Sequence, residues 1–169
     1  MCEGEVTIEV SGKPPIIPLR PSVHWRSAPI TMLLILASIA GFLLVLFNLF
    51  SLVALLTYTP VEISSRGLLF GEMGGQYWRL VTPAFLHFHW LHIAFNCLWL
   101  WELGVRVERV MGSLNMIALF LVIAAVSNAS QFLFGGPGLF GGMSGVVYGL
   151  LGFCWVGPHL QPRWRIQPP

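Results

Sequence analysis

Aspartate is absent from this chain of 169 residues, and charged residues of all kinds make up only 9% of it. A soluble domain carries about a quarter charged residues, so this composition excludes an ordinary soluble domain and favours a membrane protein. The net charge of +2 is too small to indicate a nucleic-acid partner. Three cysteines without a regular spacing predict neither a disulfide framework nor a metal knuckle.

The N-terminus lacks the basic start and short apolar core of a cleavable signal peptide. Residues 1–29 are polar, acidic and proline-bearing before the first apolar run begins. We therefore expect a short cytoplasmic arm.

Long apolar runs are what the sequence has in abundance. About 20 apolar residues cross about 30 Å of hydrocarbon as a helix, and lipid offers no partner to unpaired backbone groups. The sequence therefore predicts an all-α, multi-pass membrane bundle. Its four expected spans cover residues 30–58, 84–103, 114–134 and 143–157, with an exterior loop at 59–83 and a cytoplasmic tail at 158–169.

The basic residues of the short loops predict the orientation. A cytoplasmic N-terminus leaves only Arg66 and Arg79 on the exterior side. The cytoplasmic side then holds the larger basic set: Lys13, Arg20, Arg26, Arg106, Arg109, Arg163 and Arg165. The exterior loop is long for a bundle connection, and Trp78 and Arg79 suit a lipid–water interface, so it is either functional or a spacer.

The stretch "FGGMSGVVYGLLGF" places Ser144 between glycines at the start of the fourth expected span. That span is short, about 20 Å of helix, so Ser144 lies inside the membrane at the bottom of a wet pocket. There it is either a helix N-cap or a nucleophile whose oxyanion is stabilised by the helix N-terminus. Gly141, Gly145 and Gly149 form a small-residue stripe for helix packing, and Tyr148 lies one turn below Ser144.

The second expected span is unusually polar for a membrane helix. His92 and Asn96 share one helix face, and both can donate hydrogen bonds to a developing oxyanion. They also fit interhelical hydrogen bonding, and His89 with His92 fits a metal site, although the lack of aspartate and of paired cysteines disfavours metal. Beyond the cytoplasmic end of this span, Glu108 fits either a surface ion pair or a clamp between helix ends.

These motifs, taken together and in order, resemble the rhomboid family of intramembrane serine proteases. "HFHWLHIAFN" is similar to the family's H-x(4)-H-x(3)-N, and "GGMSG" to its G-x-S-G. The other matching positions are Trp78 and Arg79 in the exterior loop and the G-x-x-x-E-x-x-x-G set Gly104, Glu108 and Gly112.

The resemblance implies a nucleophilic Ser144, with His92, Asn96 and the Ser144 backbone N–H as the oxyanion hole. It implies that Gly142, Gly145 and Tyr148 support the serine and that His87 and Arg79 hold the exterior loop. It also implies single-span membrane proteins as substrates, cleaved in or near the lipid bilayer, and neither metal nor cofactor. The location would be a plasma membrane, the inner one in a bacterium.

The family takes its general base from an A-H-x-x-G-x-x-x-G pattern on a sixth span, and the sequence does not contain this pattern. The resemblance also implies that such a further helix packs against the stripe of Gly141, Gly145 and Gly149. His159 lies about 22 Å along the helix from Ser144, and His24 lies on the cytoplasmic side. We therefore expect four spans of six, no base histidine in this chain, and a truncated, inactive protease. The alternative is a catalytically dead rhomboid-like protein that binds membrane clients without cleaving them.

Overall fold

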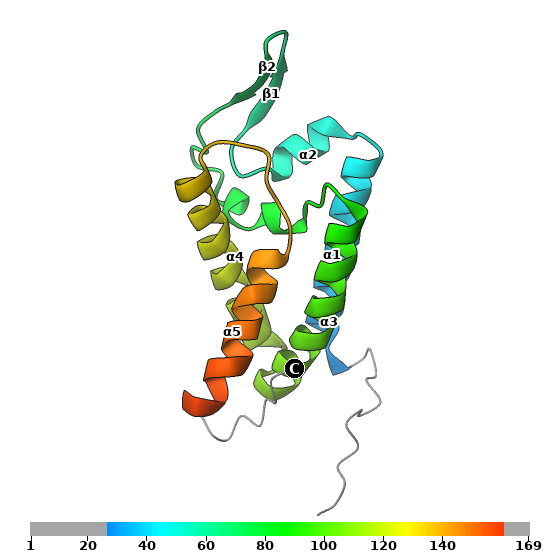
Figure 1. Ribbon diagram of the computed structural model, residues 1–169, viewed down its shortest axis with the longest axis vertical. Helices are drawn as coiled ribbons and strands as arrows, with labels where there is room; N and C mark the ends of the chain where they lie inside the picture. Colours follow the sequence, from blue (N-terminus) through cyan, green and yellow to red (C-terminus); the bar gives the residue numbers. More distant parts are fainter. Residues whose placement is uncertain (1–26, 161–169) are drawn as a thin grey trace, which may run out of the picture.

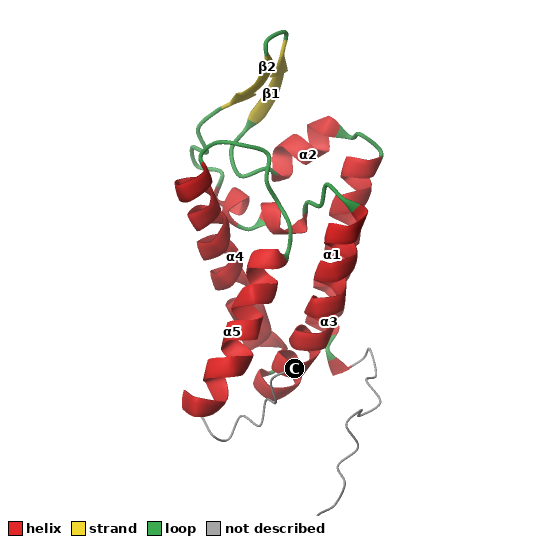
Figure 2. Ribbon diagram, in the orientation of Figure 1, coloured by secondary structure: helices red, strands yellow, loops and turns green. Residues whose placement is uncertain are grey.

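The computed structural model describes residues 27–160 of the chain. Most of the expected arm at 1–29 and of the expected tail at 158–169 therefore lies outside the described residues. Four long helices run side by side, and a short helix and a hairpin cover one end of them (Figures 1 and 2). The long helices are α1 (Pro29–Leu46), α3 (Trp90–Met111), α4 (Ser113–Gly135) and α5 (Ser144–Leu160).

The apolar run at 30–58, expected as one span, forms two helices. α1 ends at Leu46, and α2 (Phe50–Leu56) lies across the upper end of the bundle (Figure 1). Between them, Asn48 takes a left-handed φ of 54°, which asparagine tolerates better than most residues. The expected single span is therefore corrected. A hydropathy pattern does not show the left-handed conformation of a single residue, so it could not locate the break.

The helix expected at 84–103 begins and ends later than expected. Two 3-10 turns, η2 (Tyr77–Leu80) and η3 (Thr82–Phe85), precede it, and His89 is still extended at φ −139°. α3 then continues to Met111, where Gly112 ends it with a φ of 84°. His87 and His89 therefore lie ahead of the helix.

The last two helices lie close to their expected positions. α4 covers 113–135 against the expected 114–134. α5 begins at Ser144 and continues as a helix to Leu160, and its apolar part, Ser144–Gly157, ends where the expected span ends. A proline removes only one helical N–H, and the remaining hydrogen bonds carry the helix past it.

A β-hairpin lies within residues 59–83, and the all-α prediction did not include it. β1 (Val61–Ser64) and β2 (Gly67–Phe70) pair antiparallel, and Ser64 lies opposite Gly67. Two residues, Ser65 and Arg66, make the turn, and Gly67 takes a φ of 120°. The hairpin projects from the upper end of the bundle (Figure 2).

The outer surface of the bundle is apolar. α1 and α4 are long and apolar enough to cross a membrane, with mean hydropathies of 2.5 and 2.0, and α5 contains a shorter apolar helix over Ser144–Gly157. Leu33, Leu36, Val122 and Val126 on α1 and α4 are all more than half exposed, as lipid-facing side chains are. The protein is thus a helical membrane bundle, and the count of four spans stays a prediction.

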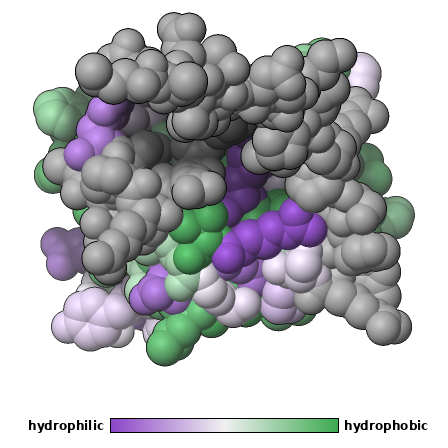
Figure 3. Space-filling view, turned by 90° about the horizontal axis from the view of Figure 1, so that it is seen from below, coloured by the Kyte–Doolittle hydropathy of each residue, from purple (hydrophilic) through white to green (hydrophobic). Residues whose placement is uncertain are grey.

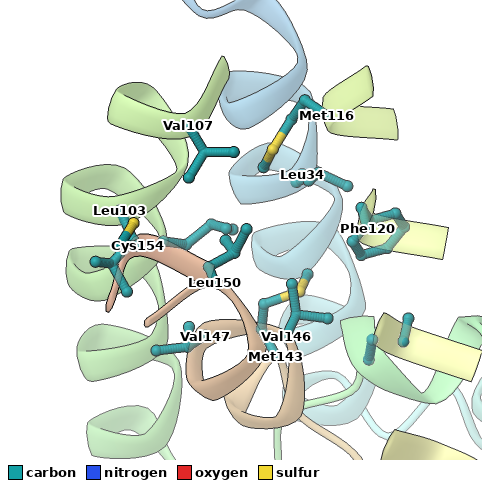
Figure 4. Close-up of a cluster of buried hydrophobic side chains, with 13 residues drawn as sticks. Leu34, Leu103, Val107, Met116, Phe120, Met143, Val146, Val147, Leu150 and Cys154 are labelled. Atoms are coloured by element: carbon teal, nitrogen blue, oxygen red, sulfur yellow. The ribbon is translucent and has the colours of Figure 1, made fainter. Parts of the chain in front are cut away.

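The buried core lies between α5 and its neighbours. Leu150 and Cys154 of α5 are fully buried against side chains of α1, α3 and α4 (Figure 4). The partners that Figure 4 labels on these three helices are Leu34, Leu103, Val107, Met116 and Phe120. The packing of these core side chains fixes the position of α5 and therefore of its first turn.

Polar side chains lie beside apolar ones at the lower end of the bundle (Figure 3).

Candidate active site

Ser144 is the first residue of α5. The first backbone hydrogen bond of the helix runs from Val147 N to Met143 O at 2.9 Å. The N–H groups of Ser144, Gly145 and Val146 therefore precede the hydrogen-bonded ladder and form the positive end of the helix dipole. Within residues 27–160, Ser144 Oγ makes no hydrogen bond, so the serine does not act as the N-cap that one interpretation of the sequence predicted.

Ser144 lies where two hollows meet. One is a groove of about 390 Å³ between α3 and α5, and its lining includes His92, Asn96, Ser144 and Tyr148. The other, of about 1040 Å³, opens toward α4 and also reaches Ser144 and His92. Its α4 wall is polar: Ser127, Asn128, Ser130 and Gln131. The serine is thus reachable from an apolar groove on one side and a polar hollow on the other.

Gly142 allows the close approach of His92 to the serine. Gly142 has a φ of +123°, and a Cβ there would overlap the imidazole ring of His92. Any larger residue would displace the ring and strain the backbone. The glycine two residues before Ser144 therefore sets the distance between α3 and the start of α5.

Asn96 of α3 is held in place by His87, which lies in the chain just before α3. Its Nδ2 lies 3.1 Å from His87 Nε2, and His87 is fully buried. The other ring nitrogen of His87, Nδ1, lies 3.1 Å from the carbonyl oxygen of Phe85. Burial, which disfavours the charged imidazolium, lowers the pKa of His87 to about 4, so its ring is neutral at pH 7.

The glycine stripe packs inside the described bundle. A Cβ at Gly145 would meet Ser127, and one at Gly149 would meet Ile123, so both glycines face α4. Gly141 packs against the backbone of Pro83 instead. This corrects the expectation that the stripe receives a further helix. Tyr148, by contrast, is 71% exposed and lines the α3–α5 groove.

Arg79 is buried in the segment between α2 and α3, and it binds carbonyl groups at the end of α2. Its guanidinium donates to the carbonyl oxygens of Ala54 at 2.8 Å and Thr57 at 2.7 Å, and to Gln76 Oε1 at 2.7 Å. Burial lowers the pKa of this guanidinium. The neighbouring Trp78 donates its indole N–H to Leu55 O at 3.2 Å and remains half exposed. Both side chains thus tie the loop to α2.

Glu108 makes the contacts of a clamp between helix ends. Its carboxylate accepts hydrogen bonds from the backbone N–H groups of Ile30 and Thr31 and from the hydroxyls of Thr31 and Ser113. It therefore caps the first turn of α1 and reaches the first residue of α4. Gly104 leaves room for Thr31, and Gly112 makes the turn between α3 and α4.

No metal centre emerges from the described part of the chain. No three His, Cys, Asp or Glu side chains there converge on a common point. His89 and His92, the pair considered for a metal, therefore lack a third partner among those residues.

The sequence interpretation missed two polar links: the bond from His87 to Asn96, and that from Asn128 Nδ2 to Leu80 O at 2.8 Å. His87, Asn96 and Asn128 were visible in the sequence as polar positions in apolar runs, but no local pattern showed which groups each of them contacts.

Comparison with known proteins identifies the fold around this serine. Residues 74–167 match the model of the Rhomboid domain, and this range contains Ser144, His92 and Asn96. The chain is 48% identical over 94 residues to the rhomboid protease GlpG of Serratia proteamaculans and 45% identical to that of Yersinia pseudotuberculosis. Each match covers 56% of this chain and 34% of the relative, so the chain spans about a third of the length of these relatives. The family model covers more than half of the chain, and the protein is a member of the rhomboid family.

Proposed function

We propose that this protein is a rhomboid-type intramembrane serine endopeptidase whose nucleophile is Ser144. The observation that carries the proposal is the position of Ser144 at the first turn of α5, beside His92 and Asn96. A serine at a helix start is not by itself a nucleophile. Here, however, two side-chain donors of α3 and the unpaired N–H groups of α5 surround one groove.

The chemistry follows the general scheme of serine acyl transfer. Ser144 Oγ attacks the carbonyl carbon of the scissile bond and gives its proton to a base. The negative oxygen that forms accepts hydrogen bonds from the Ser144 N–H, the His92 imidazole and the Asn96 amide. The base then protonates the leaving amine, and water hydrolyses the acyl-enzyme to release the second product and regenerate Ser144.

The general base of this scheme is not identified among residues 27–160. Among the described residues, no histidine is hydrogen-bonded to Ser144 Oγ. A general base must come within about 3 Å of the hydroxyl or act through one water. The resemblance to rhomboids assigns that role to a histidine on a further helix. The α3–α5 groove, which exposes Tyr148 next to Ser144, has room for such a side chain.

The substrates we propose are single-span membrane proteins. Ser144 opens a helix in an apolar bundle, and the groove beside it is lined by Phe95, Trp99 and Leu151 as well as by the polar groups. An extended segment leaving the bilayer finds apolar contacts there and donors at one end. We further propose four spans with a cytoplasmic N-terminus, which puts the hairpin on the exterior side.

The second candidate function is a rhomboid-like protein that binds membrane clients without cleaving them. The unbonded Ser144 hydroxyl favours it. The juxtaposition of Ser144, His92, Asn96 and Gly142 favours the protease, because binding alone requires no oxyanion donors around a serine.

A fluorophosphonate probe distinguishes the two functions. The chain in detergent is treated with the probe with and without free imidazole, which is small enough to enter the groove and act as a base. Labelling that Ser144→Ala abolishes and that Ser51→Ala, an exposed serine of α2, leaves unchanged supports the protease. A folded chain without Ser144-dependent labelling in either condition contradicts the nucleophile and favours client binding.

A further inference from the structure

His87 joins three segments of the protein through one buried imidazole. It lies between η3 and α3, and its exposed fraction is 0%. Its Nδ1 contacts Phe85 O of the preceding turn at 3.1 Å. Its Nε2 contacts Asn96 Nδ2 of α3 at 3.1 Å and the backbone N of Met143, directly before α5, at 3.4 Å.

The two backbone partners determine which nitrogen carries the proton. The carbonyl of Phe85 can only accept, so Nδ1 must donate and therefore bears the hydrogen. The N–H of Met143 can only donate, so Nε2 must present its lone pair. A neutral imidazole has one donor and one acceptor nitrogen, and this arrangement uses both.

The same tautomer determines the orientation of the Asn96 amide. Because Nε2 is an acceptor, Asn96 must turn its NH₂ group toward the ring and its oxygen away from it. An amide NH₂ carries two donors, and His87 uses one of them. Asn96 lines the groove with Ser144, so the second N–H is the donor left for an oxyanion.

We propose that His87 is a positioning residue that holds the Asn96 amide in its oxyanion-donating orientation through the Nδ1–H tautomer. The inference rests on the proposed function, in which Asn96 stabilises the oxyanion. His87 does not line the groove itself, whereas His92, whose ring centroid lies 5.2 Å from that of His87, does. The two histidines therefore have separate tasks: His92 faces the reacting atoms, and His87 acts through Asn96.

Nitrogen-15 NMR of the full chain, labelled at histidine and asparagine side chains and held in detergent micelles, tests the tautomer directly. The His87 signals are assigned by their loss in His87→Gln. We expect a protonated Nδ1, a bare Nε2, and a scalar coupling from Nε2 to the labelled side-chain nitrogen of Asn96. A protonated Nε2, or no coupling to Asn96, overturns the inference. This readout does not depend on whether Ser144 is reactive.

Two isosteric variants test the consequence for the site. Glutamine places an amide oxygen near the position of Nε2 and can accept from Asn96, whereas asparagine places its amide near Nδ1 and cannot reach. Loss of one oxyanion donor lowers rates about 100- to 1000-fold, so misorientation should cost about 10- to 100-fold. We therefore expect His87→Asn to slow imidazole-assisted labelling of Ser144 by that factor and His87→Gln to remain within about 5-fold of the parent.

A double-variant cycle shows whether His87 acts through Asn96. In an Asn96→Ala background, His87→Asn should add less than about a 3-fold loss, because the group it positions is gone. An undiminished loss in that background overturns the inference while leaving the protease assignment intact. Equal labelling of Ser144→Ala and the parent defeats the protease assignment instead, and the NMR result still decides the orientation of Asn96.

Discussion

Thr31 donates two hydrogen bonds to the same carboxylate oxygen of Glu108, from its backbone N–H at 2.8 Å and from its hydroxyl at 2.8 Å. The other carboxylate oxygen accepts from Ile30 N at 2.9 Å and Ser113 Oγ at 2.7 Å. One side chain near the end of α3 thus satisfies two unpaired N–H groups of the first turn of α1 and holds the start of α4. The carboxylate of Glu108 therefore joins α1, α3 and α4 at this end of the bundle.

Glu108→Gln should therefore destabilise the bundle strongly. Each carboxylate oxygen accepts from one backbone N–H and one hydroxyl, and only the hydroxyl can turn to accept. The amide NH₂ of glutamine therefore always faces a backbone N–H that cannot accept, and we expect a loss of about 1–3 kcal/mol in the free energy of unfolding. Glu102→Gln is the matched control, because Glu102 pairs with Arg106 on a partly exposed face and its loss should cost less than about 1 kcal/mol. Denaturant unfolding in micelles measures both, and equal losses would refute the clamp.

Gly142→Ala should disable the site more than it destabilises the fold. The new Cβ enters the space of the His92 ring, and the φ of +123° is unfavourable for any L side chain. We expect about 1–3 kcal/mol of destabilisation and loss of Ser144 labelling. Gly138→Ala is the control, since a Cβ there meets no atom within 4 Å. Unchanged labelling in Gly142→Ala would show that the position of His92 is immaterial.

The sequence predicted those features that depend on runs of residues. The apolar segment of α4 was located to within one residue at each end, because a long apolar run and a long helix coincide there. The start of α5 at Ser144 was also predicted, because glycines interrupt the chain directly before it. In both cases the signal is local and covers many residues.

Features that depend on one residue or on a distant partner were not predictable. The break after α1 requires the left-handed Asn48, which hydropathy averages away. The link from His87 to Asn96 requires that the chain ahead of α3 folds back onto the helix, and no periodicity reports this. The sequence interpretation assigned the partner of Gly149 to a further helix, whereas Ile123 of α4 fills that place.

This packing leads to a rescue experiment between α4 and α5. Gly149→Ala places a methyl group against the Ile123 side chain and should destabilise the bundle by about 1–3 kcal/mol. Ile123→Ala removes the clashing atoms, so the double variant should be more stable than the sum of the two single effects predicts, by at least about 0.5 kcal/mol. Gly152→Ala is the control: a Cβ there meets nothing within 4 Å, so this variant should lose no stability and gain up to about 1 kcal/mol from the higher helix propensity of alanine. Strict additivity would contradict direct contact.

Arg79→Lys tests the tie between the exterior loop and α2. A guanidinium reaches Ala54 O, Thr57 O and Gln76 Oε1 together, and a single ammonium cannot match that fork. We expect a loss of about 1–3 kcal/mol and faster proteolysis of the loop. Arg66→Lys, at the exposed turn of the hairpin, should be neutral. Equal protease resistance of both variants would show that the buried guanidinium does not hold the loop.

The pH dependence of stability should carry the signature of His87. Burial lowers the pKa of His87 from 6.5 to about 4, so above pH 6.5 the ring is neutral in both folded and unfolded chains. As the pH falls from 6.5 to 4, the unfolded chain takes up a proton that the folded chain does not, and stability decreases by up to about 3 kcal/mol. In His87→Gln this contribution disappears, while the other titrating groups, including the adjacent His92, remain. The difference between the two unfolding curves over this range should therefore shrink as the pH falls, and parallel curves would mean that His87 titrates normally in the folded protein.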